Sequence, residues 1–312
     1  MQPTIDLIRT TYLSRFNEMT LEYRLHFTSR LYAWNSDPEA ARLLRAIQPE
    51  VLPANHEDRL QALKDIREEL VHKDYARDVN DYTRRKPFFD SYPNLLLLHN
   101  ALFRIRHWLC IYGQDERTSL YEIIPKDDVE ELISELRADA PAMRALSTYA
   151  INTLYLYEKL FDQKGIDPET ILDLASSYDR SNPSDVQIMI YLYTHCILGE
   201  TLFYYQPIAS HSDTYLRMLE ELDTLIEENF DTISLDNKCE FLVCSQICGY
   251  EARQKTRIED EVARSVGAED FIVDTHNSAT NPAKQSFMMS EHRNVLFIMS
   301  QSKPVFQRQP IS

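Results

Sequence analysis

Glycine is scarce in this chain, with only 5 residues against 14 prolines among 312. Tight β-hairpins, phosphate-cradling loops and dinucleotide-binding turns all need glycine, because it adopts backbone conformations that other residues avoid. Its scarcity argues against all three. Hydrophobic residues make up 44% of the chain and aromatic residues 11%, which is the composition of a packed globular protein. The composition therefore favours an all-α fold.

A basic face is also lacking. The chain has 33 basic and 49 acidic residues, for a net charge of −16, and the acidic excess is uneven. Residues 1–125 hold 17 basic and 18 acidic residues, whereas residues 126–312 hold 16 and 31. Affinity for nucleic acid depends on neutralising phosphates, so we expect no nucleic-acid partner. An acidic surface favours basic partners instead.

No run of apolar residues is long enough to cross a membrane. The most apolar stretch is IMIYLYTHCILGETLFYY, residues 188–205, which contains His195, Gly199 and Glu200. Because a spanning helix needs about 20 apolar residues, we expect a core helix and no membrane association. The start, MQPTIDLIRTTYLSRF, has charges where a secretory signal has an apolar region, which predicts a cytoplasmic protein.

Motifs that would fix a reaction or a cofactor are absent. The chain has no phosphate-binding loop, no H-E-x-x-H, no G-x-S-x-G and no two E-x-x-H motifs of the di-iron bundle type. Cys239, Cys244 and Cys248 lack the C-x-x-C spacing of a zinc site, so we expect buried reduced thiols, no metal and no cofactor. Arg67 and His72 match the R-x4-H spacing of one class of helical ribonucleases, but this composition gives about two such matches by chance.

Helical periodicity recurs along most of the chain, and prolines or short polar clusters separate the segments. Only EDFIVDT, residues 269–275, is a candidate strand. We expect helices at about 3–17, 20–33, 37–47, 56–82, 93–112, 126–137, 141–162, 168–178, 185–205, 212–229, 236–256, 258–266 and 286–301.

The most apolar helices recur at a roughly regular interval. Their first strongly apolar residues are Leu95, Met143, Ile188 and Phe241, which are 48, 45 and 53 residues apart. This spacing predicts an all-α fold of irregular stacked helical hairpins, resembling an α-solenoid or an α/α toroid. A compact multi-helix bundle is the alternative. A charge shift near residue 120 predicts an N-terminal subdomain, 1–120, and an acidic C-terminal one, 121–312, with a single domain as the alternative.

Several polar residues interrupt apolar helices, which makes them candidates for a site. Gly199 follows His195 by one turn and leaves space beside the imidazole. If the apolar helices line one cavity, four residues are candidates for acid–base chemistry: His99, His195, Glu200 and His276. Five others are candidates for binding: Arg106, Tyr191, Asp274, Asn277 and His292.

Two functions follow from these patterns. The first is binding of a protein or peptide partner, favoured by the helical spacing, the acidic charge and the absence of a catalytic motif. The alternative is an enzyme with a histidine-lined pocket that performs acid–base chemistry on a small molecule. Convergence of the histidines on one place is the observation that separates the two.

Overall fold

The computed structural model describes residues 2–72, 79–274, 285–306 and 309–311, with side chains from residue 4 to 71 and from 84 onward within these ranges. The described residues form sixteen α-helices and no strand, which confirms the all-α prediction. The predicted strand is reduced to one isolated bridge between Val266 and Ile272. Whether the helices form a solenoid, a toroid or a bundle stays a prediction.

The chain divides into two compact units. The first unit contains residues Met1–Ile47 and Ser177–Arg308, and the second contains Gln48–Ser176 and Gln309–Ser312. Compactness does not test which segments fold on their own, so the predicted boundary near residue 120 stays a prediction.

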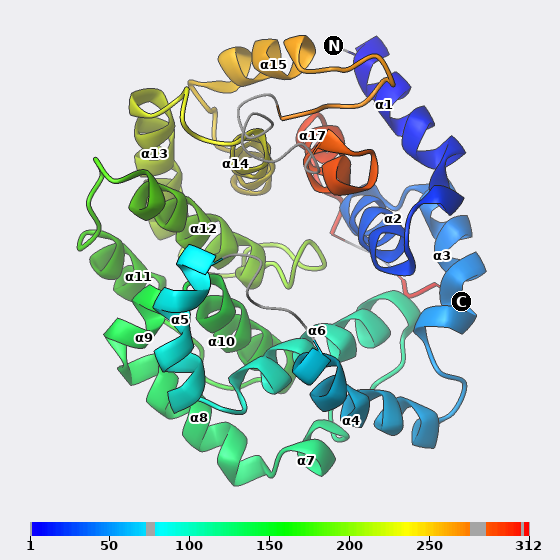
Figure 1. Ribbon diagram of the computed structural model, residues 1–312, viewed down its shortest axis with the longest axis vertical. Coiled ribbons are helices and arrows are strands. Elements are labelled where there is room, and N and C mark those ends of the chain that lie inside the picture. Colours follow the sequence, from blue (N-terminus) through cyan, green and yellow to red (C-terminus); the bar gives the residue numbers. More distant parts are fainter. Residues whose placement is uncertain (1, 73–78, 275–284, 307–308, 312) are drawn as a thin grey trace. The chain divides into compact units, whose positions relative to one another are not determined.

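In the first unit, α14 packs against α12, α13, α15 and α17 (Figure 1). The helix α17 also packs against α1 and α2. Segments from both ends of the chain therefore meet at α17. The helices of this unit are α1 (Gln2–Ser14), α2 (Leu21–Asn35), most of α3 (Pro38–Val51), α12 (Pro183–Glu200), α13 (Ser212–Glu228), α14 (Leu235–Cys248), α15 (Lys255–Arg264) and α17 (Glu291–Ser300).

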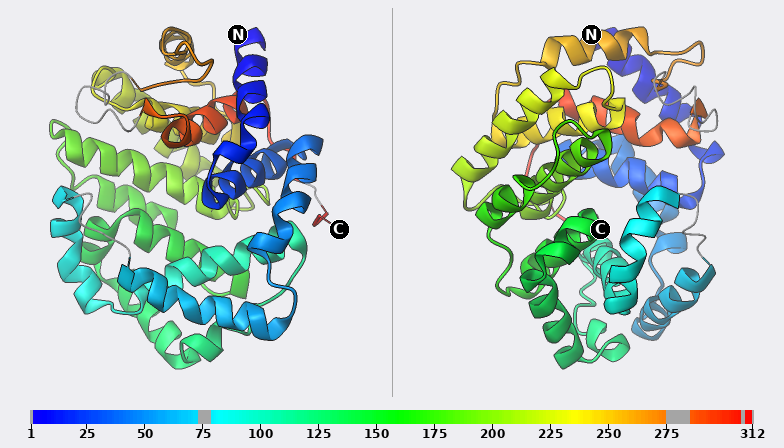
Figure 2. Two further views of the ribbon diagram at one scale, coloured as in Figure 1. Left: turned by 45° about the vertical axis from the view of Figure 1, so that its right-hand side comes forward. Right: turned by 60° about the vertical axis from the view of Figure 1, so that its left-hand side comes forward.

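In the second unit, α6 packs against α4 and α10, and α10 also packs against α8 and α9 (Figure 2). The short helix α7 contacts α4, and α5 contacts α9. The helices of this unit are α4 (His56–His72), α5 (Val79–Ser91), α6 (Leu95–Tyr112), α7 (Leu120–Ile123), α8 (Lys126–Ala138), α9 (Ala140–Leu146), α10 (Thr148–Phe161) and α11 (Pro168–Ala175).

Local sequence explains several helix ends. Asp167 and Asn182 each accept a hydrogen bond from a backbone N–H two residues on, and each precedes a proline at the first helical position. Gly113 and Gly249 end α6 and α14 in the left-handed conformation that glycine adopts without a steric penalty. These signals are why the starts of α11 and α12 match the predicted positions closely.

One predicted helix is interrupted, and another falls partly outside the described residues. Of the predicted helix 56–82, the structure describes α4 up to His72 and α5 from Val79, which continues to Ser91, while residues 73–78 lie outside the described residues. The segment 141–162 is divided into α9 and α10 because Ser147 has a φ of 49°. Periodicity alone cannot detect a single residue that leaves the helical conformation.

The apolar stretch 188–205 is not helical to its end. α12 stops at Glu200, and Leu202, Phe203 and Tyr204 then have φ angles of 49°, 53° and 79°. A left-handed conformation costs an L-residue about 1–2 kcal/mol, so three in succession form a strained turn. All three side chains are buried. None of the described helices combines the length and hydropathy needed to cross a bilayer.

A buried ion pair connects α14 to α15, and its loss should destabilise the first unit. Lys238 is fully buried, and its Nζ donates to Glu261 Oε2 at 2.6 Å. Removing one partner leaves an uncompensated buried charge, so we expect Lys238→Met to lower the free energy of unfolding by about 3–5 kcal/mol. Lys86→Met removes an exposed pair with Asp90 and should cost less than about 1 kcal/mol. Urea denaturation measures both, and equal effects would contradict this assignment.

Candidate functional site

Three histidines and three carboxylates come together in the first unit. Two of the histidines, His195 and His292, were singled out from the sequence, and the third, His26, was not. They meet because α14 packs against α12 and α17, while α17 packs against α2. We call this group the histidine–carboxylate cluster; its members are His26, His195, Asp236, Glu240, Glu291 and His292.

Each imidazole faces a carboxylate on another helix. His26 Nδ1 lies 2.6 Å from Glu291 Oε2, and His292 Nδ1 lies 3.2 Å from Asp236 Oδ1. His195 Nε2 lies 3.4 Å from Glu240 Oε1. The ring centres of His26 and His292 are 5.5 Å apart. Two of the three pairs are therefore close enough to act on one small molecule.

Each carboxylate lies deeper than the imidazole that it faces. The side chains of Glu291 and Glu240 are 0% and 4% exposed, whereas those of His26 and His292 are 33% and 34% exposed. Within the described structure, the Oε1 atoms of Glu240 and Glu291 are buried and accept no hydrogen bond. Because buried polar atoms are nearly always hydrogen-bonded, these two oxygens are unusual.

The environment moves the pKa values of this cluster apart. Burial raises the pKa of Glu291 to about 8, despite the opposing charges of Arg30 and His292. Burial would also raise the pKa of Asp236, but His292 and Arg293 together hold it at about 2. Burial lowers the pKa of His195, against the charge of Glu240. At neutral pH, Glu291 therefore keeps its proton, Asp236 is ionised and His195 is neutral.

Aromatic rings flank His195 on both sides along the chain. The rings of Tyr191 and Phe203 have their centres 6.1 and 6.3 Å from that of His195. Phe203 belongs to the strained turn, and its N–H donates to Leu198 O at 2.7 Å. The strained backbone after α12 therefore places an aromatic ring beside the imidazole. Strain of this kind is found mainly at functional sites.

The other candidates of the first unit lie in different surroundings. Glu200 is buried and accepts a hydrogen bond from Tyr215 on α13 at 3.3 Å. Asp274 is buried, and its charge acts on Lys238. His276 and Asn277 lie outside the described residues. The proposed roles of these four residues stay predictions.

His99 and Arg106 belong to the second unit. His99 Nδ1 lies 3.2 Å from Thr153 Oγ1, and its ring lies against those of Phe103 and Tyr149. Arg106 is buried, with its guanidinium 5.8 Å from the centre of the Phe103 ring. Both residues therefore adjoin Phe103. Their roles in a site stay predictions.

The five cysteines are free thiols. Burial raises the pKa of Cys110 to about 11 and that of Cys248 to about 12, and it also raises the pKa values of Cys239 and Cys244. Protonated thiols are poor nucleophiles and poor metal ligands. Within the described residues, no group of three or more His, Cys, Asp or Glu side chains is arranged to hold a metal ion.

Among the hollows lined by described residues, two lie away from the cluster. One in the first unit has a volume of about 260 Å³ and lies beside the end of α14, where Ser245, Tyr250 and Lys255 line it. The other, of about 360 Å³, lies in the second unit beside the end of α10. Neither is lined by the histidine–carboxylate cluster.

Comparison with known proteins adds nothing to this description, because no family model, no curated protein and no solved structure matches the chain. A function therefore has to be argued from the geometry of the chain itself.

Glu291 should make stability fall as pH rises. Its folded pKa of about 8 exceeds the ordinary value of 4.5, so the folded chain holds a proton that the unfolded chain releases between these values. Its contribution to stability is complete below about pH 4.5 and is lost as pH rises to about 8. We expect Glu291→Gln, which cannot ionise, to lose less free energy of unfolding between about pH 5 and pH 8 than the wild type.

Urea denaturation at several pH values measures this difference. The lowered pKa of His195 acts in the opposite direction, because its contribution to stability is lost as pH falls below 6.5. His195 is present in both the wild type and Glu291→Gln, so its effect on stability cancels when the two are compared. Glu39→Gln serves as a control, since Glu39 is exposed and Arg42 lowers its pKa by a hydrogen bond. Identical pH profiles for wild type and Glu291→Gln would contradict the assignment.

Proposed function

We propose that the histidine–carboxylate cluster is an acid–base site at which a small molecule gains and loses protons. The observation that supports this most strongly is the arrangement of His26 and His292. Their rings are 5.5 Å apart, each is oriented through Nδ1 by a carboxylate, and both are partly exposed. A carboxylate on one ring nitrogen fixes the orientation of an imidazole and stabilises its cation.

Acid–base catalysis needs a proton donor and a proton acceptor in opposite states at the same pH. The raised pKa of Glu291 keeps a proton within reach of His26, while Asp236 is ionised and contacts Nδ1 of His292. One of these two histidine–carboxylate pairs is then suited to exchange a proton with a substrate. The other pair supplies or removes the second proton that completes the reaction. His195 remains neutral and is suited to accept.

The surroundings indicate an anionic substrate with an apolar part. Arg30 acts electrostatically on both Glu291 and His195. Its Nη1 is buried and has no hydrogen-bond partner in the described structure, so it has a donor left for an anionic group. Tyr191 and Phe203 offer aromatic surface beside His195. We therefore infer a small carboxylate or phosphate compound as the substrate class.

Partner binding, the other function predicted from the sequence, remains a proposal of its own. Its support is the acidic charge of residues 126–312 and does not depend on the cluster. We favour acid–base chemistry because His195 and His292 are separate candidates on two different helices, and both belong to the histidine–carboxylate cluster.

Proton exchange provides a test that does not require the substrate to be known. The purified protein is incubated in D₂O with a mixture of small carboxylates and phosphates, and mass spectrometry then detects deuterium gain or new products. We expect the wild type to change at least one compound. His26→Gln and His292→Gln should each slow that change about 100-fold, which is the usual contribution of a general acid or base.

His99→Gln is the matched control, because it removes a histidine from the second unit and leaves the cluster intact. It should retain the activity of the wild type. If the wild type changes no compound, or if His292→Gln is as active as the wild type, the proposal is wrong. If His99→Gln abolishes the activity and the two cluster variants do not, the site lies elsewhere.

A further inference from the structure

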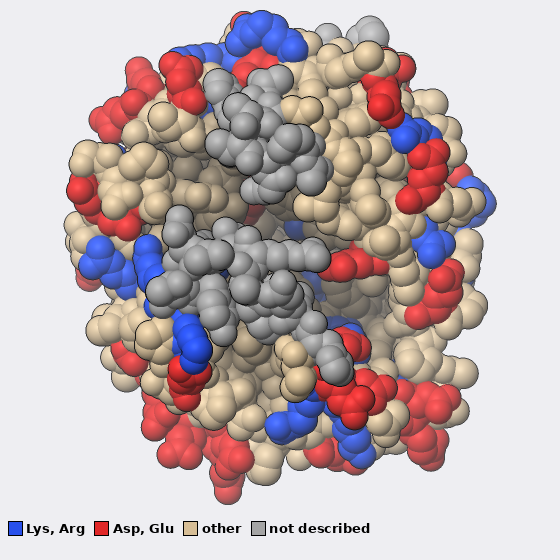
Figure 3. Space-filling model, in the orientation of Figure 1, with Lys and Arg blue, Asp and Glu red and all other residues tan. Residues whose placement is uncertain are grey.

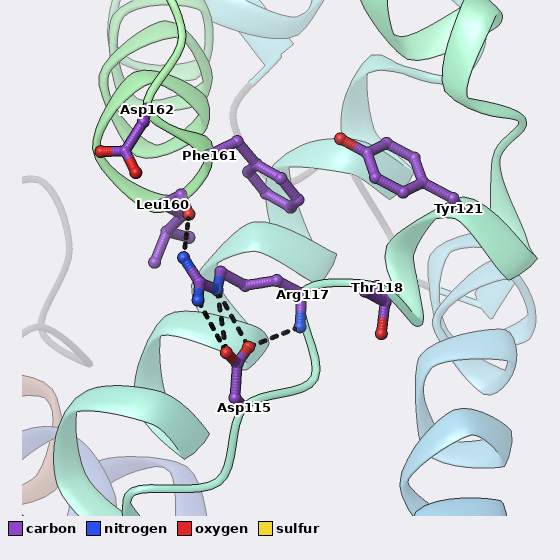
Figure 4. Close-up of a pocket in the computed structure, with 7 residues that line it drawn as sticks. All are labelled: Asp115, Arg117, Thr118, Tyr121, Leu160, Phe161 and Asp162. Carbon is purple, nitrogen blue, oxygen red and sulfur yellow. Dashed lines mark hydrogen bonds and ion pairs between the residues drawn. The ribbon is translucent and has the colours of Figure 1, made fainter.

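A pocket of about 360 Å³ opens in the second unit, between the loop that precedes α7 and the end of α10 (Figure 4). Its volume is near the lower end of the range of about 300–1,000 Å³ found for small-ligand sites, so it has room for one side chain or one small molecule. It is lined by Asp115, Arg117, Thr118, Tyr121, Leu160, Phe161 and Asp162.

The one cation in this pocket is already paired. Arg117 donates from Nε and Nη2 to the carboxylate of Asp115, and from Nη1 to Leu160 O at 2.9 Å (Figure 4). This geometry neutralises the charge of Asp115, and each nitrogen of the Arg117 guanidinium already donates a hydrogen bond. The carboxylate of Asp162 is exposed and acts electrostatically on the Arg117 guanidinium. The three charged residues that line the pocket therefore carry a net charge of −1.

The end of α10 adds to the negative potential around Asp162. Asp162 follows this helix of 14 residues directly, and its φ of 52° places it in the left-handed conformation. A helix C-terminus carries partial negative charge and attracts cations. The C-terminal end of α10 and the carboxylate of Asp162 therefore both favour a cation at the same edge of the pocket.

Aromatic rings form the adjoining wall. The ring centres of Tyr121 and Phe161 are 5.6 Å apart, and Phe161 stacks on Tyr157 at 5.1 Å. Ring faces attract cations, and the planar guanidinium of arginine stacks on them better than an ammonium does. The rings of Tyr121 and Phe161 therefore offer faces on which a guanidinium can stack.

The surface around the pocket is strongly acidic. Residues 113–176 contain 14 acidic and 6 basic residues, so this fifth of the chain carries −8 of the net charge of −16. Acidic side chains gather over α8, where Asp127, Asp128, Glu130, Glu131 and Glu135 are exposed (Figure 3). The charge of Glu130 reaches the Tyr157 hydroxyl, so the acidic face of α8 adjoins the aromatic wall.

We propose that this pocket binds an arginine side chain from a basic segment of a partner protein. The guanidinium contacts the rings of Tyr121 and Phe161 and pairs with Asp162, while the carboxylates of α8 attract basic residues that flank the arginine. Charge complementarity selects this occupant, because an anion would face the excess negative charge of the whole surface. The site lies in the second unit and does not depend on the acid–base proposal.

A fluorescein-labelled hexa-arginine peptide tests the proposal by fluorescence anisotropy at low ionic strength. We expect Asp162→Asn to weaken binding about 5- to 10-fold through loss of the ion pair and its cation–aromatic support. Asparagine tolerates the left-handed conformation, so the backbone should be retained. Tyr121→Leu should weaken binding to a similar extent, whereas Tyr121→Phe should keep it, because the ring is preserved. Hexa-lysine should bind more weakly than hexa-arginine.

Asp213→Asn is the matched control, since it removes one exposed carboxylate from the first turn of α13 in the first unit. It should change the affinity less than about 2-fold, as expected for a single distant, screened charge. Two outcomes would overturn the proposal. Either the wild type does not bind hexa-arginine, or Asp162→Asn weakens binding no more than Asp213→Asn does, which would indicate diffuse attraction to an acidic surface.

Discussion

The burial of carboxylates between α2, α12, α14 and α17 is the constraint on which the first unit depends. An ionised carboxylate removed from water is strongly destabilising unless an opposite charge or a hydrogen bond compensates it. Glu240 and Glu291 lie in the interior, where each meets an imidazole from a neighbouring helix, and Glu291 also keeps its proton at neutral pH. Each helix pair that shares a histidine and a carboxylate of the cluster also packs together. Packing and proton chemistry therefore depend on one set of contacts.

Stability alone does not account for this arrangement. An apolar core of similar volume is often as stable as one built on buried charge, and here two buried carboxylate oxygens also lack hydrogen bonds. The left-handed turn at Leu202–Tyr204 adds conformational strain beside His195. Two unfavourable features in one region, next to partly exposed imidazoles, are the usual sign that a fold gives up stability for function.

The sequence predicted most of the helices but only part of the cluster. His195 was found because an imidazole is conspicuous in an apolar run, and Glu240, within CEFLVC, has the same pattern but was overlooked. His26 lies in LEYRLHFTSR, where polar and apolar residues alternate and a histidine is not conspicuous. Glu200 interrupts its run just as His195 does, yet its hydrogen bond is to Tyr215. Which polar residues meet depends on which helices pack, and periodicity does not encode that.

The two units use charge in different ways. In the first, imidazoles and carboxylates pair across helices, so burial determines which groups hold a proton. In the second, the carboxylates of α8 are exposed and outnumber the nearby basic residues, so water and salt screen them. Paired buried charges suit proton transfer, whereas an unpaired exposed excess acts at a distance on a partner's charge. The net charge of the chain therefore indicates how its surface attracts charged partners. Acid–base chemistry is expected instead at the buried pairs, where opposite charges compensate each other.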